Sequence, residues 1–315
     1  MSSAVLDQAT QRQSTAPAQR LRTTMAAVRV SIQWFGTRKT LTREQKSEAA
    51  DTFGAEGAFL SAGKKLIDTS HPAFKTVTSI RGKILGLWRA ETLPFPEPGV
   101  RLIRQDRIDS FSARMQELRD ELGEAVWRLD EHFAELKSAA RERLGRLFNP
   151  ADYPASLRGL FSVEWDFPNV DAPDFLRELN PKLYQEECQR VQARFDEAVR
   201  MAEEGFVAEL AKLISHLTER LSGQDDGKSR VFRDSVVENL SEFFQRFRTL
   251  SVCSNEQLDQ LVADAQQVIR GVAPQDLRDN AALRQHVAAE MSQVQSVLDG
   301  LLIDRPRRNI LRRPR

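Results

Sequence analysis

The feature that most constrains this chain is an apolar repeat that runs without interruption from Ile108 to Leu147. Its members are spaced by threes and fours, which keeps one face of an α-helix apolar for about eleven turns. A helix of roughly forty residues is about 60 Å long, whereas a compact domain of this length is only ~50 Å across. We therefore expect an elongated molecule built from long helices. The repeat consists of Ile108, Phe111, Met115, Leu118, Leu122, Val126, Leu129, Phe133, Leu136, Ala140, Leu144 and Leu147.

A second repeat of similar length begins after Pro181 and ends at the Gly-rich turn 223–227. The sequence thus predicts two long helices, near 106–148 and 181–222. Because they have matching lengths, the simplest arrangement packs them antiparallel, as a coiled-coil-like hairpin. The second stripe consists of Cys188, Val191, Phe195, Ala198, Ala202, Phe206, Leu210, Leu213, Leu217 and Leu221.

Two short segments, near 28–35 and 160–167, show the alternation of apolar and polar residues that is typical of half-buried strands. A third short strand is expected at 100–103, directly after the Pro- and Gly-rich break 94–99. Since an isolated strand cannot satisfy its own backbone hydrogen bonds, we expect these segments to pair with one another. The predicted fold class is mainly α: an elongated long-helix hairpin bundle with a small two- or three-stranded sheet at one end.

The predicted organisation has three parts. Residues 1–25 are rich in Gln, Ser, Thr and Ala and are interpreted as a disordered leader. Residues 26–303 are expected to form a single elongated helical domain, and 304–315 an Arg-rich flexible tail. Shorter helices are expected at 42–53, 72–89, 231–250, 256–270 and 277–302.

Composition favours no particular class of partner. The 46 basic and 45 acidic residues nearly cancel, so no overall field favours nucleic acid or an acidic membrane. Two cysteines far apart in the sequence suit a reducing compartment. No run of about eighteen apolar residues is present, so we predict no membrane span. We expect a cytoplasmic protein.

No motif points to an enzyme. Gly57–Lys65 invites comparison with a P-loop, but five residues separate its glycines and Lys65 occupies the hydroxyl position. No serine sits in a nucleophile elbow. None of the histidines has a partner at ligand spacing in the sequence. The sequence therefore predicts no catalytic, cofactor-binding or metal-binding residue, and no cofactor. The histidines are His71, His132, His216 and His286.

Clustered basic residues are the candidate contacts for a protein partner or for nucleic acid. An Arg-rich tail could bind phosphates without sequence preference, and two basic turns lie near predicted strand or helix ends. The alternative interpretation is a solubilising terminus and solvated caps. The candidate residues are Arg38, Lys39, Lys64, Lys65, Arg305, Arg307, Arg308, Arg312, Arg313 and Arg315.

Three motifs resemble those of a known family. The first strand and the turn Gly36–Thr42 look like its opening Gly-Arg-Lys-Lys-Leu turn, and Gly63–Asp68 is similar to its second signature. The strand Phe161–Trp165 after a long helix matches its midpoint. The chain resembles, over Val28–Ala273, the bacterial and phage family catalogued as domain of unknown function 3150.

The resemblance implies partners but no chemistry. An inserted Thr37 and a Thr at position 40 depart from the family's first motif. Members are typically encoded beside a MoxR- or cobaltochelatase-like AAA+ ATPase and a von Willebrand A-type protein, in phage or other mobile elements among other settings. No catalytic residues are established for the family, so none is carried over.

These observations lead to a functional hypothesis. The chain is expected to be a non-catalytic helical scaffold or adaptor in an assembly with an AAA+ ATPase and a von Willebrand A-type partner. The alternative is a nucleic-acid-binding accessory factor that uses the Arg-rich tail. A third interpretation, a membrane-active helical protein, fits poorly with heavily charged helix faces. The oligomeric state is open, because heptads serve intramolecular and intermolecular seams equally well.

Overall fold

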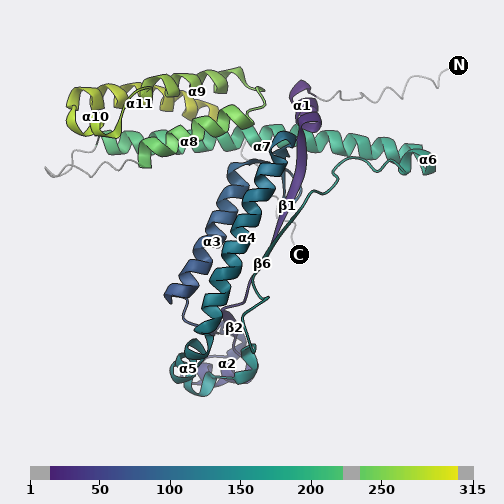
Figure 1. Ribbon diagram of the computed structural model, residues 1–315, viewed down its shortest axis with the longest axis vertical. Coiled ribbons are helices and arrows are strands. Elements are labelled where there is room, and N and C mark those ends of the chain that lie inside the picture. The colour runs from purple at the N-terminus through teal and green to yellow at the C-terminus, as the bar shows by residue number, and fades with distance from the viewer. Residues whose placement is uncertain (1–14, 223–234, 304–315) are drawn as a thin grey trace. The chain divides into compact units, whose positions relative to one another are not determined.

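The computed structural model describes residues 15–222 and 235–303, which are mainly helical (Figure 1). The chain divides into two compact units, where the sequence predicts one domain over 26–303. Unit 1 comprises Met1–Ala27, Thr92–Gln105 and Asn169–Arg315. Unit 2 comprises Val28–Glu91 and Asp106–Pro168.

Unit 1 is organised around one long helix, α7, which occupies the range predicted for the second repeat. Helices α1, α8 and α11 pack along it, and α9 packs against α8 and α11. The helices of unit 1 are α1 (Ala16–Thr24), α6 (Leu176–Leu179), α7 (Pro181–Ser222), α8 (Ser235–Leu250), α9 (Glu256–Ile269), α10 (Pro274–Asp279) and α11 (Ala281–Ile303).

The core of unit 1 is a contiguous cluster of buried apolar side chains. Leu210, Ile214 and Leu217, one helical turn apart on α7, are fully buried. Phe206 of α7 makes edge-to-face contacts with Phe243 and Phe247 of α8, with ring centroids 6.1 and 5.0 Å apart. The stripe predicted from the sequence is therefore the face that α7 buries.

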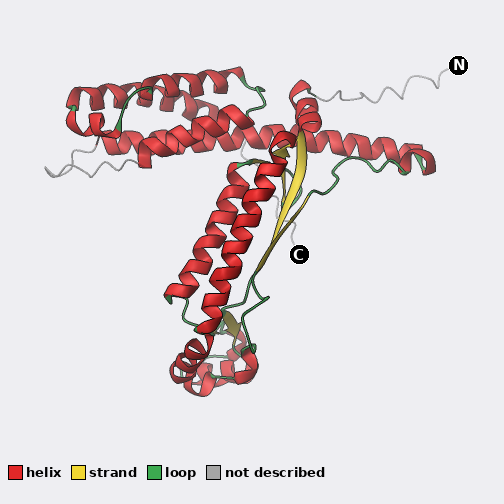
Figure 2. Cartoon of the chain, viewed as in Figure 1, coloured by secondary structure: helices red, strands yellow, loops and turns green. Residues whose placement is uncertain are grey.

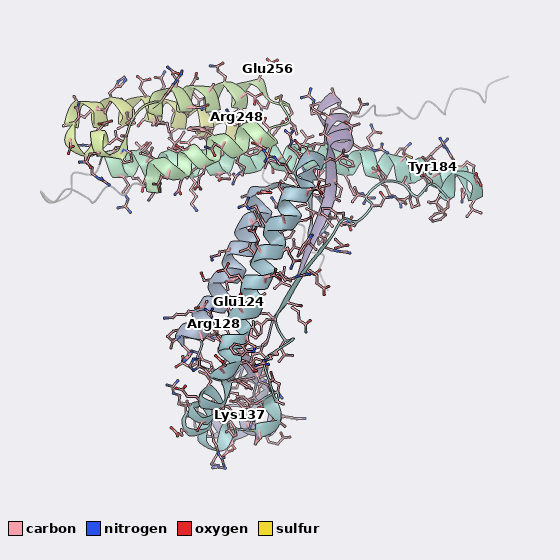
Figure 3. The ribbon with its side chains drawn as sticks, viewed as in Figure 1. Glu124, Arg128, Lys137, Tyr184, Arg248 and Glu256 are labelled. Atoms are coloured by element: carbon pink, nitrogen blue, oxygen red, sulfur yellow. The ribbon has the colours of Figure 1, made fainter. Side chains whose placement is uncertain are left out.

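Unit 2 is built on the packing of α3 against α4. Their facing stripes are buried, Val77 and Ile80 on α3 and Phe111 and Met115 on α4. The exposed side of α4 carries opposite charges one turn apart, such as Glu124 and Arg128 (3.7 Å; Figure 3). The helices of unit 2 are α2 (Arg43–Asp51), η1 (Gly57–Phe59), α3 (Pro72–Ala90), α4 (Ile108–Glu131), α5 (Phe133–Leu144), η3 (Gly145–Leu147) and η4 (Pro150–Asp152). The short helix η2 (Gln105–Arg107) leads into α4.

Two expectations about the long helices need correction. The continuous helix predicted over 106–148 is wrong at His132, where α4 ends and α5 begins. There the His132 N–H donates to the Leu129 carbonyl (3.2 Å), three residues back, which interrupts the α-helical hydrogen-bond pattern. The predicted hairpin of the two long helices is not confirmed, because the main partner of α4 is α3, while α7 packs on helices of unit 1.

The main sheet has four strands in the order β4-β5-β1-β6 (Figure 2). Strand β1 pairs antiparallel with β6, with Ile32 opposite Val163, and β4 pairs antiparallel with β5. Strands β1, β5 and β6 correspond to the three predicted ones, while β4 and the separate pair β2–β3 were not expected. The strands are β1 (Met25–Gln33), β2 (Arg38–Thr40), β3 (Gly63–Lys65), β4 (Thr92–Pro94), β5 (Val100–Arg104) and β6 (Ser162–Asp166).

The ends of the described chain also differ from expectation. Residues 16–24, part of the predicted disordered leader, form α1, which begins at a Thr15 cap and buries Ala18 and Leu21. The predicted helix 277–302 is divided at Asn280 into α10 and α11, because the Asn280 side chain accepts from the Leu283 N–H (3.0 Å) and caps α11. Residues 1–14 and the Arg-rich tail 304–315 lie outside the described residues. No described helix is both long and apolar enough to cross a membrane.

Candidate binding site at the β2–β3 sheet

The structure brings the two predicted basic turns together. Strands β2 and β3 of unit 2 pair antiparallel, which places Arg38 opposite Lys65 and Lys39 opposite Lys64. Residues 41–62, which include α2 and η1, connect the two strands. Four candidate contact residues that were predicted from separate motifs therefore lie in one small sheet.

Two of the four are paired with the same carboxylate. Lys39 and Lys64 form ion pairs with Asp152 at 2.5 and 2.6 Å, and the Asp152 and Lys64 side chains are almost completely buried. Hydrogen bonds from Lys39 and then Lys64 hold the pKa of Asp152 below its usual range, although desolvation opposes them. We call these three residues the Asp152 cluster. Their role is structural, because they join β2 and β3 to η4.

Further polar contacts close the same region. Lys64 Nζ also donates to the Leu147 carbonyl (2.6 Å), and the buried Tyr153 hydroxyl donates to the Leu66 carbonyl (2.8 Å). Desolvation raises the pKa of Tyr153. Lys137 of α5 lies over the Tyr153 ring, 5.7 Å from its centroid (Figure 3). We define the β2–β3 lobe as residues 38–66 together with 145–153.

The other two predicted residues remain available to a partner. Arg38 and Lys65 are exposed, and in the part of the chain that the structure describes neither forms an ion pair. Like charges directly opposite each other on a strand pair are destabilising. An anionic group bound between Arg38 and Lys65 would relieve that repulsion.

The connection between β2 and β3 exposes two aromatic side chains. Phe53, after α2, is 82% exposed, and Phe59, in η1, is 88% exposed. Gly57 lets η1 approach α2 closely, because a Cβ atom at this position would lie 3.1 Å from Ser47 Cα. The β2–β3 lobe thus carries two exposed phenylalanines as well as the exposed Arg38 and Lys65.

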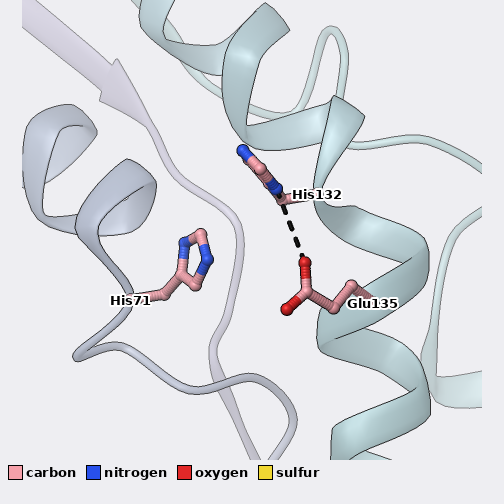
Figure 4. Close-up of side chains that lie close together, drawn as sticks. All are labelled: His71, His132 and Glu135. Atoms are coloured by element: carbon pink, nitrogen blue, oxygen red, sulfur yellow. Dashed lines mark ion pairs between the residues drawn. The ribbon is translucent and has the colours of Figure 1, made fainter.

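A second cluster in unit 2 was missed at the level of sequence. His71, His132 and Glu135 come together where α3 begins and α4 meets α5 (Figure 4). The two imidazole centroids are 5.1 Å apart, and His132 Nδ1 lies 3.6 Å from Glu135 Oε2. The spacing His-x-x-Glu of His132 and Glu135 is visible in the sequence. The contribution of His71 could not be predicted from spacing, because His71 is distant in the chain.

The other candidate sites have weaker support. The P-loop-like segment forms η1 and β3, so its lysines lie in a strand and not before a helix. A small pocket of unit 1 between α7 and the α8–α9 loop contains Glu203 and Asp259, and each accepts a hydrogen bond from a serine hydroxyl. The candidate tail residues Arg305 to Arg315 lie outside the described residues.

Comparison of the chain with protein-family models, with curated proteins and with solved structures finds no match.

Proposed function

We propose that the protein is a non-catalytic helical adaptor whose β2–β3 lobe binds an acidic surface of a protein partner. The observation that carries this proposal is the exposed, unpaired Arg38–Lys65 pair, on a lobe that also exposes Phe53 and Phe59. Aromatic residues, phenylalanine included, and arginine are enriched in protein interfaces relative to the rest of the surface. Two exposed phenylalanines do not stabilise an isolated lobe. Their burial against a partner would contribute favourable free energy to binding.

The identity of the partner comes from the motif resemblance. Two of the motifs that carry it, Gly36–Thr42 and Gly63–Asp68, include β2 and β3. We therefore propose an AAA+ ATPase as the partner, in an assembly that includes a von Willebrand A-type protein, and a cytoplasmic location. In this proposal the ATPase supplies the energy, and this chain positions its target.

The test is affinity purification of the tagged full chain from its native cell, followed by mass spectrometry. Arg38→Glu/Lys65→Glu reverses both unpaired charges and should reduce recovery of the partner at least tenfold. Lys75→Glu/Arg89→Glu on the exposed side of α3 makes the same charge change elsewhere in unit 2 and should leave recovery unchanged. Equal recovery with both double variants would refute the proposed interface, and ATPase activity of the purified chain alone would refute a non-catalytic role.

A nucleic-acid-binding accessory factor that uses the Arg-rich tail is the second candidate, to which the exposed Arg38 and Lys65 would add further phosphate contacts. Binding that depends on phosphates weakens steeply with salt. This alternative predicts such binding to an oligonucleotide, and its loss when Arg305 to Arg315 are deleted. Undiminished binding by the truncated chain would exclude the tail as the contact.

A further inference from the structure

We propose that His71, His132 and Glu135 form a binding site for a divalent transition-metal ion of the Zn²⁺ type. One ligand atom from each residue lies within 4.8 Å of the other two. Two imidazoles and one carboxylate are a donor set that suits Zn²⁺, which commonly leaves a fourth position to water. The site is distinct from the proposed partner surface and does not rest on it.

The distances are close to those that a metal requires. Zn–N and Zn–O bonds of about 2.0–2.2 Å in a tetrahedral arrangement place neighbouring ligand atoms roughly 3.3–3.5 Å apart. His132 Nδ1 and Glu135 Oε2 are 3.6 Å apart already. His71 approaches from the opposite side, and its ring faces the other two side chains (Figure 4). His132 and Glu135 are exposed, so no packed neighbour opposes the side-chain rotations that would bring the remaining ligand atoms to coordination distance.

The two segments that carry the ligands are held together independently of any ion. Asp68 Oδ1 accepts from the Ser70 N–H (2.9 Å), which shapes the turn before His71. Arg143 of α5 donates to the other oxygen of Asp68 (2.7 Å), and α5 is the helix that carries Glu135. The backbone positions of the three ligands are therefore set before a metal binds.

Metal binding would be coupled to the start of α3. His71 is the N-cap of α3, and its Nδ1 accepts from the Ala73 N–H at 3.3 Å. In the neutral ring this assigns the proton to Nε2, and Nε2 lies on the edge of the ring that faces His132 and Glu135 (Figure 4). An ion that binds Nε2 needs its lone pair, so the proton moves to Nδ1 and the cap is lost. The site therefore exchanges a capping hydrogen bond for a metal bond.

The capping role of His71 suggests a variant that removes the metal ligand but keeps the helix cap. Asn is a preferred N-cap residue, so His71→Asn keeps an acceptor for Ala73 and removes the imidazole. His132→Asn removes the second imidazole, and Glu135→Gln removes the carboxylate charge without changing the size of the side chain. His216→Asn on α7, in unit 1, is the control for loss of a histidine elsewhere.

The experiment is calorimetric titration of the untagged full chain with ZnCl₂, together with the visible absorption of CoCl₂ as a substitute ion. We expect saturable binding of one ion per chain, weakened at least tenfold by each of the three cluster variants and unchanged by His216→Asn. Circular dichroism verifies that each variant is folded. Failure of the wild-type chain to bind at a ratio of one to one would overturn the proposal. So would binding by His71→Asn, His132→Asn or Glu135→Gln that is as tight as that of the wild type.

Discussion

Different interactions stabilise the interior of each of the two units. Unit 1 buries a contiguous apolar cluster along α7, in which Leu210 is fully buried. Unit 2 has an apolar α3–α4 interface, but its β2–β3 lobe is closed by polar contacts, with the Asp152 cluster as the central one. Apolar burial depends little on pH, whereas an ion pair is lost when one of its partners changes protonation state. Stability should therefore respond to pH in the β2–β3 lobe more than in unit 1.

The sequence offers a probe that separates the two units. All four tryptophans, at positions 34, 88, 127 and 165, belong to unit 2. Tryptophan fluorescence thus reports on unit 2, while far-UV circular dichroism is dominated by helices of both units. Differences between the two signals measure how far the units behave separately.

The largest effect is expected for Leu210→Asp in unit 1. A carboxylate without a partner in a fully buried apolar position is among the most destabilising changes known, and we expect a loss of more than about 4 kcal/mol in the free energy of unfolding. Circular dichroism should lose helical signal at temperatures where tryptophan fluorescence is still native. The control is Leu179→Asp, the same change at a site that is 77% exposed. If both signals were lost together, the two cores would be a single cooperative unit.

Asp152→Asn should have the next largest effect, this time on unit 2. The substitution removes the negative charge and replaces one of the two carboxylate oxygens by an NH2 group, so that Lys39 and the buried Lys64 share a single neutral acceptor on this side chain. Loss of a hydrogen-bonded partner from a buried group costs about 2–3 kcal/mol. We expect a lower urea midpoint by tryptophan fluorescence. An unchanged midpoint would show that the β2–β3 lobe does not depend on this cluster.

Acid should act on the same residue. The pKa of Asp152 is lowered in the folded protein, so its contribution is fully present above the unfolded value of about 3.9 and is lost as the pH falls through the lower folded value. Tryptophan-detected stability should therefore decline below about pH 4. Asp152→Asn should decline less steeply over that interval, and parallel curves for the variant and the wild type would contradict the assignment.

The smallest effect is expected for an exposed ion pair of unit 1. Arg22 and Asp171 lie 2.8 Å apart, but about half of each side chain is exposed. Such pairs contribute less than about 1 kcal/mol, so Arg22→Ala should barely change the melting temperature. A loss of stability as large as that expected for Asp152→Asn would contradict the proposed difference between the two units.

Local patterns in the sequence were sufficient for individual elements. Period-two alternation located β1 and β6, the Pro- and Gly-rich break located the start of β5, and the apolar stripe with Pro181 at its start located α7. The break at His132 was not predictable from the same stripe, because Leu129, Phe133 and Leu136 continue the spacing of threes and fours across it. An apolar repeat says which face is buried and not whether the helix is continuous.

The structure was needed to show which helix packs against α4 and to locate the two candidate sites. One apolar stripe can pack against any other, so the pattern could not decide between α3 and α7 as the partner of α4. Strands β2 and β3 have three residues each and expose most of their side chains, so they show no apolar alternation. The sequence identified the four basic residues by their charge. It did not indicate that Asp152 forms ion pairs with Lys39 and Lys64 and leaves Arg38 and Lys65 exposed.

The division of the chain has a consequence for synthesis on the ribosome. Unit 2 is complete once Pro168 has emerged, whereas α1 and β4 of unit 1 pack on α7, which follows later. Ala18 and Leu21, which are translated before α7, therefore stay uncovered until α7 has also emerged from the ribosome. Nascent chains stalled when Pro168 has left the exit tunnel, but α7 has not, should already hold a closed β2–β3 lobe, with α1 still exposed to chaperones.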